Sequence, residues 1–178
     1  MNAAGPSVSA KRALLSSAFI FPLLALASFS IGAEAALITF TTFTYHIWMR
    51  LAAGYLVRGF RISGNAAIFR ISEKEYSLIC RTQIRKWKHM LPTYDPAGFD
   101  ASDLISLRSV MLHSELTHMI ISVLSFLPLI AAFSSDYLRS SWPVFLATSA
   151  FSSAFDYLFV LEQRYNRKRT ERIIGRRA

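Results

Sequence analysis

Residues 109–133 read SVMLHSELTHMIISVLSFLPLIAAF, an apolar run whose first half is interrupted by Glu115 and His118. A helix needs about 20 mainly apolar residues to cross a bilayer, and this run is long enough. A charged side chain in hydrocarbon costs about 3 kcal/mol, so such residues face the interior of a helix bundle or water. The run therefore predicts a membrane-spanning helix with a polar, functional face.

Three further apolar runs of similar length occur in the chain. Hydrophobic residues make up 53% of the 178 residues and charged residues only 17%, which is too little charge to cover a soluble globule. We predict an all-α integral membrane protein, a four-helix bundle that forms a single membrane domain over residues 1–178. The spans are expected at about 13–31, 35–53, 110–133 and 143–161, with an insert at 54–109 and a basic tail at 162–178.

The first run allows a second interpretation. Lys11 and Arg12 precede its apolar core, and the sequence AEA at 33–35 follows it in a small-x-small pattern that resembles a signal-peptide cleavage site. The core is longer than the roughly 7–15 residues typical of such peptides. We therefore favour a helical hairpin that turns at residues 32–34, with a cleaved signal peptide as the alternative.

The basic residues predict the orientation in the membrane. With four spans, 19 of the 20 lysines and arginines fall on the same side. The positive-inside rule makes that side cytoplasmic, so both termini of this multi-pass protein are expected in the cytoplasm. Topology and contact with the lipid surface explain the formal net charge of +9, and we expect no nucleic-acid partner.

The insert between the second and third spans contains a predicted amphipathic helix. Ser72 and Glu75 form a capping-box pattern at its start. Apolar and aromatic residues then recur at helical spacing, with basic residues on the other faces. Such a helix is typical of the membrane interface, where we expect it to lie flat beneath a cytoplasmic site. A plain connector between two spans is the alternative.

Polar side chains from three spans fall at one depth. Each of these side chains lies about five to eight residues from the cytoplasmic end of its span, which is roughly 7–12 Å below the cytoplasmic membrane boundary. They are His46, Glu115, His118 and Asp156. Glu115 and His118 are three residues apart on one helix face, whereas His113 points elsewhere. We predict that these four side chains form a cluster that opens toward the cytosol.

Each member of this predicted cluster also has a purely structural explanation. A hydrogen bond between helices explains His46 equally well, and an ion pair with Arg50 or Arg164 explains Asp156. Glu115 and His118 form a structural ion pair in the same interpretation. A metal site is disfavoured, because E-x-x-H occurs once in the chain and di-iron sites in helix bundles need it twice, with further glutamates.

Four stretches of the chain together resemble a known family: KWKHMLPTYDPAGF at 86–99, SELTH at 114–118, SFLPL at 125–129 and FVLEQRYNRKR at 159–169. The chain is similar to the small bacterial membrane proteins grouped with glycosyl-4,4'-diaponeurosporenoate acyltransferase, which esterifies the sugar of a glycosylated carotenoid with a fatty acid. The resemblance covers about half of the chain. It implies a bacterial cell (inner) membrane acyltransferase whose substrate-binding residues include Trp87, Lys88, Gln163, Arg164, Tyr165, Asn166, Arg167 and Arg169.

Acyl transfer to a sugar hydroxyl needs a base for the hydroxyl proton and a donor group for the developing oxyanion. His118 is the natural base because imidazole titrates near neutral pH, and either Glu115 or Asp156 would orient it. Arg50, which shares a helix face with His46, is added to the substrate-binding set. The phosphates of the expected co-substrate, acyl-CoA or acyl-carrier protein, would be held by Lys88, Arg164, Arg167 and Arg169.

These interpretations imply a small set of partners and leave other function classes open. We expect no bound cofactor and no metal, and we expect the lipid bilayer, a lipid or glycolipid acceptor and the acyl donor as partners. The first alternative is a non-enzymatic scaffold of an envelope lipid or polysaccharide assembly. The second is a small transporter that uses Glu115 and His118 as a proton relay, although the outer halves of the spans carry few ionisable groups. A different membrane transferase, such as a methyltransferase, is the third.

Overall fold

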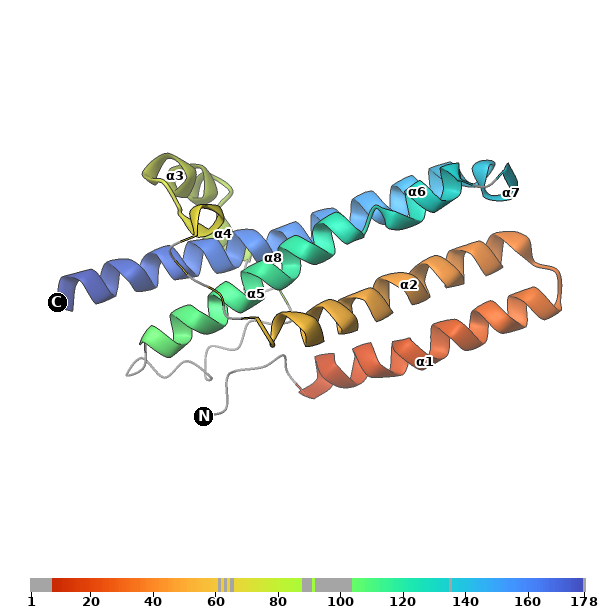
Figure 1. The fold of residues 1–178 in the computed structure, drawn as a ribbon, viewed down its shortest axis with the longest axis horizontal. Coiled ribbons are helices and arrows are strands. Elements are labelled where there is room, and N and C mark those ends of the chain that lie inside the picture. Colours follow the sequence, from red (N-terminus) through yellow and green to blue (C-terminus); the bar gives the residue numbers. More distant parts are fainter. Residues whose placement is uncertain are drawn as a thin grey trace.

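The computed structural model describes residues 8–60, 62, 64, 66–87, 91, 104–134 and 136–177. All regular structure within these residues is helical, which confirms the predicted all-α class. The long helices lie side by side along the molecule (Figure 1): α1 Val8–Ser30, α2 Glu34–Val57, α5 Leu104–Leu124 and α8 Trp142–Arg177. The shorter helices in this part of the chain are η1 Ala67–Phe69, α3 Glu73–Arg81, α4 Ile84–Trp87, α6 Leu127–Phe133 and α7 Asp136–Arg139.

Three helical segments of the described chain are long and apolar enough to cross a membrane, namely Arg12–Ser30, Leu104–Phe133 and Trp142–Arg176. The chain is therefore a membrane protein. The predicted second span is not among these segments. Helix α2 contains His46, Arg50 and several threonines, which lower its hydropathy. The structure thus supports three of the four predicted spans by length and composition.

Helices α1 and α2 form the predicted hairpin. The chain turns at Gly32, whose φ of +67° lies in the left-handed region that glycine adopts without a steric cost. The Ala33 amide donates to the Ser28 carbonyl at 2.9 Å and closes the turn. Farther along, the Trp48 indole donates to the Ala18 carbonyl at 3.2 Å, so the two helices stay in contact beyond the turn.

Helices α5 and α8 form the central antiparallel pair of the fold (Figure 1). Serines line their shared face, and small side chains allow helix backbones to approach closely in membranes. The Ser122 hydroxyl donates to the Ser153 carbonyl at 2.8 Å, and the Ser125 and Ser152 hydroxyls lie 3.1 Å apart. This close contact fixes the rotation of the two helices relative to each other, and thereby the side chains that meet between them.

The predicted span at 110–133 is two helices, because the chain bends between α5 and α6. Pro128 has no amide hydrogen, so the carbonyl of Leu124, four residues earlier, has no helical donor. The Tyr45 hydroxyl of α2 donates to this carbonyl at 2.7 Å. The proline thus ends α5, and its cost is offset by a hydrogen bond from another helix.

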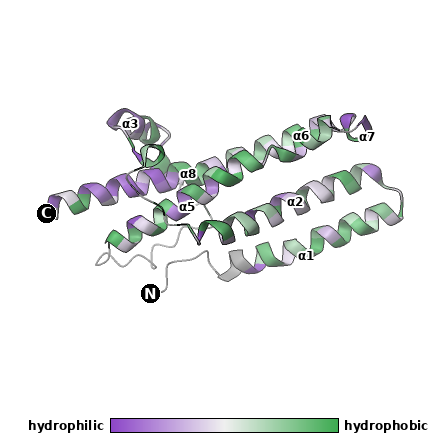
Figure 2. Ribbon diagram, viewed as in Figure 1, coloured by the Kyte–Doolittle hydropathy of each residue, from purple (hydrophilic) through white to green (hydrophobic). Residues whose placement is uncertain are grey.

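Helix α8 continues without a break from the predicted fourth span into the predicted basic tail. Its 36 residues are about 54 Å long, well beyond the hydrocarbon thickness of roughly 30 Å. Figure 2 shows that the half of α8 near the C-terminus is hydrophilic, as is α3 beside it. The described part of the tail is therefore an extension of the spanning helix.

The expected amphipathic helix of the insert is broken and packs differently from the prediction. Ser72 does cap its start, because the Ser72 hydroxyl accepts from the Glu75 amide at 3.1 Å. Gln83, with a φ of 56°, separates α3 from α4. The apolar side of both pieces is covered by α8 instead of facing a membrane interface, in a cluster of Tyr76, Ile79, Ile84, Trp87, Leu161 and Tyr165. Pro92, a residue type that ends helices, lies outside the described residues.

Candidate functional site

The polar residues predicted to form one cluster lie in two clusters, one above the other along α5 and α8. We call the first the histidine cluster, which consists of Arg50, His118, Ser152 and Asp156. We call the second the glutamate cluster, which consists of Glu75, Glu115, Arg164, Arg167 and Glu171. Helices α2, α5 and α8 supply the histidine cluster, and α3, α5 and α8 supply the glutamate cluster.

A histidine–aspartate pair is the centre of the histidine cluster. The Nδ1 atom of His118 lies 2.9 Å from Oδ1 of Asp156, which is 1% exposed. This contact fits the imidazole tautomer with the proton on Nδ1, in which the Nε2 lone pair is available. The Phe159 ring stacks on the imidazole at a centroid distance of 4.5 Å and holds its plane. No described residue forms a hydrogen bond with Nε2, which is the arrangement that a general base requires.

Arg50 holds the aspartate from the other side. Its Nη2 atom donates to Oδ2 of Asp156 and, at 2.8 Å, to the Ser152 hydroxyl. Its Nη1 atom donates to the His46 carbonyl of its own helix at 3.2 Å. Arg50, Asp156 and a neutral His118 have a total charge of zero, which reduces the cost of burial in an apolar bundle. Asp156 thus forms the ion pair with Arg50 that was its structural alternative, and it contacts His118 at the same time.

The ring of His46 is buried beside this cluster without a polar partner. The residue is 4% exposed, and neither ring nitrogen has a hydrogen-bond partner among the described residues. The hydrogen bond between helices, the structural alternative for His46, is therefore not present. The Tyr45 ring lies edge-on to it at 5.3 Å. A buried polar atom without a partner costs about 1–3 kcal/mol, so the two ring nitrogens need an explanation, and a catalytic role is one.

Glu115 does not orient His118, and this part of the prediction is wrong. The Glu115 side chain is fully buried, and its two oxygens accept from Arg164 Nε at 2.8 Å and from Arg167 Nη2 at 2.9 Å. Positions three apart on a helix differ by about 60° in direction, so His118 meets Asp156 while Glu115 meets the arginines. The carboxylate that accompanies the histidine is Asp156, which was the second candidate.

Arg164 and Arg167, predicted to bind donor phosphates, have their hydrogen-bond donors directed into the protein. Arg164 also donates to Glu75 and, at 2.7 Å, to the Ile68 carbonyl. Arg167 also donates to the Phe69 carbonyl at 2.6 Å and to Glu171 at 3.3 Å. These contacts tie the backbone at 68–69 and helix α3 to α8.

The remaining predicted substrate-binding residues lie on the C-terminal half of α8 or on α4, which packs against α8. Tyr165 is buried and stacks on Tyr76 at 5.8 Å, and the Arg169 guanidinium lies 5.7 Å from the Tyr165 ring centroid. The Trp87 indole donates to the Thr82 carbonyl at 2.9 Å. Gln163 and Asn166 are half-buried on α8, and Lys88 lies outside the described residues.

His113 lies away from both clusters, as the helical phase predicts. Its Nε2 atom is 3.1 Å from the Phe60 carbonyl, and its Nδ1 atom is 2.9 Å from the Ser109 carbonyl. Among the described residues, no three side chains of His, Cys, Asp or Glu are grouped as metal ligands would be. The two residues of the single E-x-x-H motif also contact different partners: Glu115 contacts two arginines, and His118 contacts Asp156.

Several contacts of the site involve residues that the sequence pattern did not indicate. Lys168 and Arg172 contact Glu73 at 3.1 and 2.6 Å. The hydrogen bond from Lys168, together with the charge of Arg172, lowers the pKa of Glu73. Glu171 lies four residues after Arg167, a spacing that predicts an ion pair on a helix surface. The carbonyls at 68 and 69 left no signal in the sequence, because any residue carries a carbonyl.

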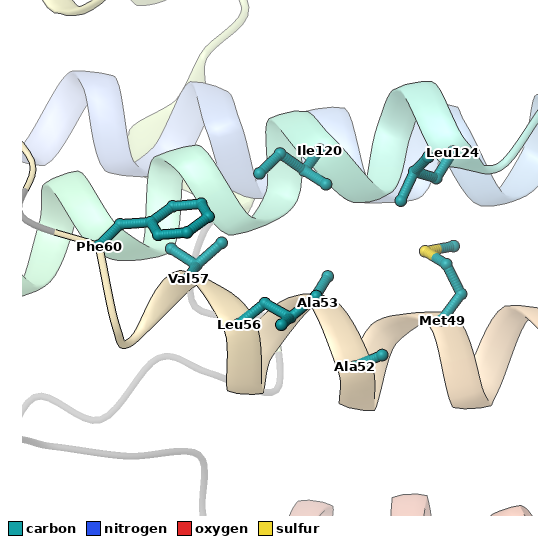
Figure 3. Close-up of a pocket in the computed structure, with 8 residues that line it drawn as sticks. All are labelled: Met49, Ala52, Ala53, Leu56, Val57, Phe60, Ile120 and Leu124. Carbon is teal, nitrogen blue, oxygen red and sulfur yellow. The ribbon is translucent and has the colours of Figure 1, made fainter.

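An apolar cavity of about 150 Å³ lies between α2 and α5, near the histidine cluster but facing another direction. Figure 3 shows that side chains of α2 and of the segment following it line it from one side, with Ile120 and Leu124 of α5 opposite. Ile120 is about 160° around α5 from His118 at 100° per residue. The cavity therefore opens away from the Nδ1 contact between His118 and Asp156.

The fold and the site define a helical membrane protein with a buried histidine–aspartate pair. The family model described as glycosyl-4,4'-diaponeurosporenoate acyltransferase matches residues 67–176, well over half of the chain, and the chain belongs to this family. The match includes all of the glutamate cluster and the pair of His118 and Asp156, whereas His46 and Arg50 precede it. No curated protein and no solved structure matches the chain significantly.

Proposed function

We propose that the chain is a membrane-bound acyltransferase that moves a fatty acyl group from a cytosolic thioester donor to a hydroxyl of a lipid or glycolipid. Family membership supports acyl transfer. The observation that carries the proposal is the His118 imidazole, with Nδ1 held by Asp156 and Nε2 without a partner among the described residues. A sugar hydroxyl is the acceptor most consistent with the family description.

The proposed reaction is a direct transfer with a balanced proton path. His118 Nε2 removes the proton from the acceptor hydroxyl, and the hydroxyl oxygen attacks the thioester carbonyl. The tetrahedral intermediate expels the thiolate, which takes the proton back from the imidazolium. Asp156 stabilises the imidazolium, and Arg50 holds Asp156 in place. The buried ring of His46 is the proposed donor to the oxyanion, a role that fits its lack of other partners.

We propose a topology of four spans with α2 as the additional one. The threonine hydroxyls of α2 donate to carbonyls four residues earlier, as Thr39 does to Ala35 and Thr42 to Ile38, so their polar atoms are satisfied within the helix. Arg50 is turned toward α8 and not toward lipid. The distribution of basic residues supports cytoplasmic termini in the inner membrane of a bacterial cell, with both polar clusters toward the cytoplasmic side.

A non-enzymatic scaffold is the second candidate, and the glutamate cluster is the observation that favours it. Every polar atom of Glu115 is used to join α5 and α8, which is what an assembly subunit needs. A scaffold has no use for the unpartnered nitrogens of His46 and His118. Turnover by the purified protein therefore separates the two candidates.

The proposal is tested with purified protein, acyl-CoA or acyl-carrier protein as donor, and lipid extract as acceptor. We expect a new lipid that is heavier by one acyl chain, detected by mass spectrometry. Total lipids of cells with and without the gene should differ by the same species. Absence of turnover across a series of donors, with a folded protein, would favour the scaffold.

A further inference from the structure

A polar cavity of about 370 Å³ lies where the ends of α5 and α8 meet the segment before α3. Its lining includes Gly64, Phe69, Arg70, Arg108, Arg167 and Glu171. The lining thus contains three arginines and one acid, and Arg167 is also paired with Glu115. An excess of arginine over acid in a concave site favours an anion, because guanidinium groups bind phosphate oxygens in pairs of parallel hydrogen bonds.

Arg108 is the arginine best placed to bind a ligand. Its Nε atom donates to Glu171 Oε1 at 3.1 Å, and no described residue accepts from its two terminal nitrogens. Its side chain is 35% exposed, so these nitrogens are within reach from the cavity. Arg167, by contrast, is buried and fixed by Glu115 and Glu171, and it contributes a charge that does not move.

Gly64 leaves room for the guanidinium group of Arg108. A Cβ atom at position 64 would lie 3.0 Å from Arg108 Nη2 and 3.0 Å from a methyl group of Leu112. Any larger side chain would displace the Arg108 head group or Leu112. The close approach of backbone to guanidinium is thus part of how the cavity is built.

We propose that this cavity binds the phosphate of the phosphopantetheine arm that acyl-CoA and acyl-carrier protein share. This inference rests on the proposed acyl transfer. Arg70 and Arg108 bind the phosphate, and Glu171 is the internal carboxylate that pairs with Arg108 when no phosphate is bound. In this proposal Arg70 and Arg108 bind the phosphate of the acyl donor, the role predicted from the sequence for Arg164 and Arg167.

The distance between the cavity and the histidine cluster supports this assignment. Arg108 and His118 are ten residues apart on α5, which corresponds to about 15 Å along the helix. The phosphopantetheine arm separates the phosphate from the thioester sulfur by an extended chain of similar reach. A phosphate at Arg108 would therefore place the thioester at about the level of His118 along the helix axis.

Direct binding of coenzyme A tests the proposal without any need for turnover. The probe is titrated into the full chain in nanodiscs of neutral lipid, with pantetheine, which lacks phosphate, as the comparison ligand. Coenzyme A should bind at least tenfold more tightly than pantetheine. Arg108→Gln and Arg70→Gln should each weaken coenzyme A binding by about tenfold, the effect of one charge-assisted hydrogen bond. Arg85→Gln, an exposed arginine of α4, is the matched control and should change nothing.

Glu171→Gln is expected to have the opposite effect on coenzyme A binding, which distinguishes a change in the cavity from simple unfolding. Removing the competing carboxylate should tighten coenzyme A binding by several-fold, an effect that a destabilised protein would not show. Unchanged affinity in both arginine variants, with thermal unfolding like that of the Arg85 variant, would overturn the proposal. The proposal is also overturned if the arginine variants weaken the interaction with anionic lipid in the nanodisc while the affinity for coenzyme A stays constant.

The two proposals fail in different ways. His118→Gln should abolish turnover and keep the affinity for coenzyme A. If coenzyme A binds in an arginine-dependent manner but no acceptor is ever acylated, the cavity stands and the proposed reaction fails. If turnover proceeds and neither coenzyme A nor the phosphopantetheinylated carrier protein depends on Arg70 or Arg108, the cavity assignment fails alone.

Discussion

Glu115 and His118 lie one turn apart on the same helix, yet their side chains differ in how many of their polar atoms are paired. Every oxygen of Glu115 is paired, and its side chain is fully buried. His118 uses one nitrogen on Asp156 and keeps the other unpaired, next to a second histidine whose ring nitrogens also have no partner among the described residues. A saturated polar cluster holds a fold together, whereas an unsaturated one has atoms left for a substrate.

The largest expected effect is on turnover and comes from a change in the histidine cluster, which has unpaired atoms. His118→Gln removes the proposed base and should lower the turnover of acyl ester by about 10²–10⁴-fold. Thermal unfolding should change little, because the imidazole makes one hydrogen bond. The matched control is His113→Gln on the same helix, where Nε2 contacts the Phe60 carbonyl and has no role in the reaction. Retained activity in the His118 variant would exclude it as the base.

A change in the fully paired glutamate cluster should mainly lower the stability of the protein. Glu115→Gln leaves the buried Arg167 and the half-buried Arg164 without their shared carboxylate, and breaking a buried ion pair costs about 3–5 kcal/mol. The purified variant should unfold at a clearly lower temperature, and any activity lost should follow the unfolded fraction. A variant with normal stability and no activity would place Glu115 in the chemistry and remove the distinction between the clusters.

A smaller effect is expected where α5 ends. Tyr45→Phe removes the donor to the Leu124 carbonyl and should destabilise the protein by about 1 kcal/mol. In a Pro128→Ala background, the new amide supplies a donor to the same carbonyl, so Tyr45→Phe should cost less. A double-mutant cycle of unfolding free energies measures this difference. Equal costs in both backgrounds would show that the hydrogen bond and the proline are independent.

The smallest effect concerns the exposed contacts of Glu73. Its pKa is lowered by the hydrogen bond from Lys168 and by Arg172, so the contribution to stability is present above the ordinary value of 4.5. That contribution is lost as the pH falls through the lower pKa of the folded state. Glu73→Gln should therefore flatten the dependence of the unfolding temperature on pH below 4.5. An unchanged slope would mean that the contacts with Lys168 and Arg172 do not contribute in solution.

Local patterns in the sequence predicted local structure well. The apolar runs identified the long helices, the Gly32 turn gave the α1–α2 hairpin, and Ser72 was placed correctly as a helix cap. Helical phase also separated His113 from the other polar residues. Each of these inferences depends on spacing within one element, which the chain carries explicitly.

The predictions that failed depend on how elements meet. Glu115 and His118 share a face to within about 60°, and that difference is enough to direct them to different parts of α8. The break at Gln83 and the acceptor carbonyls at 68 and 69 have no residue-type signature, so no pattern could indicate them. The break at Pro128 was not predicted, and nothing in the sequence indicated Tyr45 as the donor to the Leu124 carbonyl.

Helix α8 extends without interruption from Asp156 in the histidine cluster to Arg167 beside the polar cavity. Eleven residues of continuous helix correspond to about 16 Å that neither a hinge nor a loop can shorten. The helix is therefore a template of fixed length between the two sites. Under the proposed reaction, a donor whose carbonyl is too near its anionic group, or too far from it, would not reach His118 from the cavity, whatever its acyl chain.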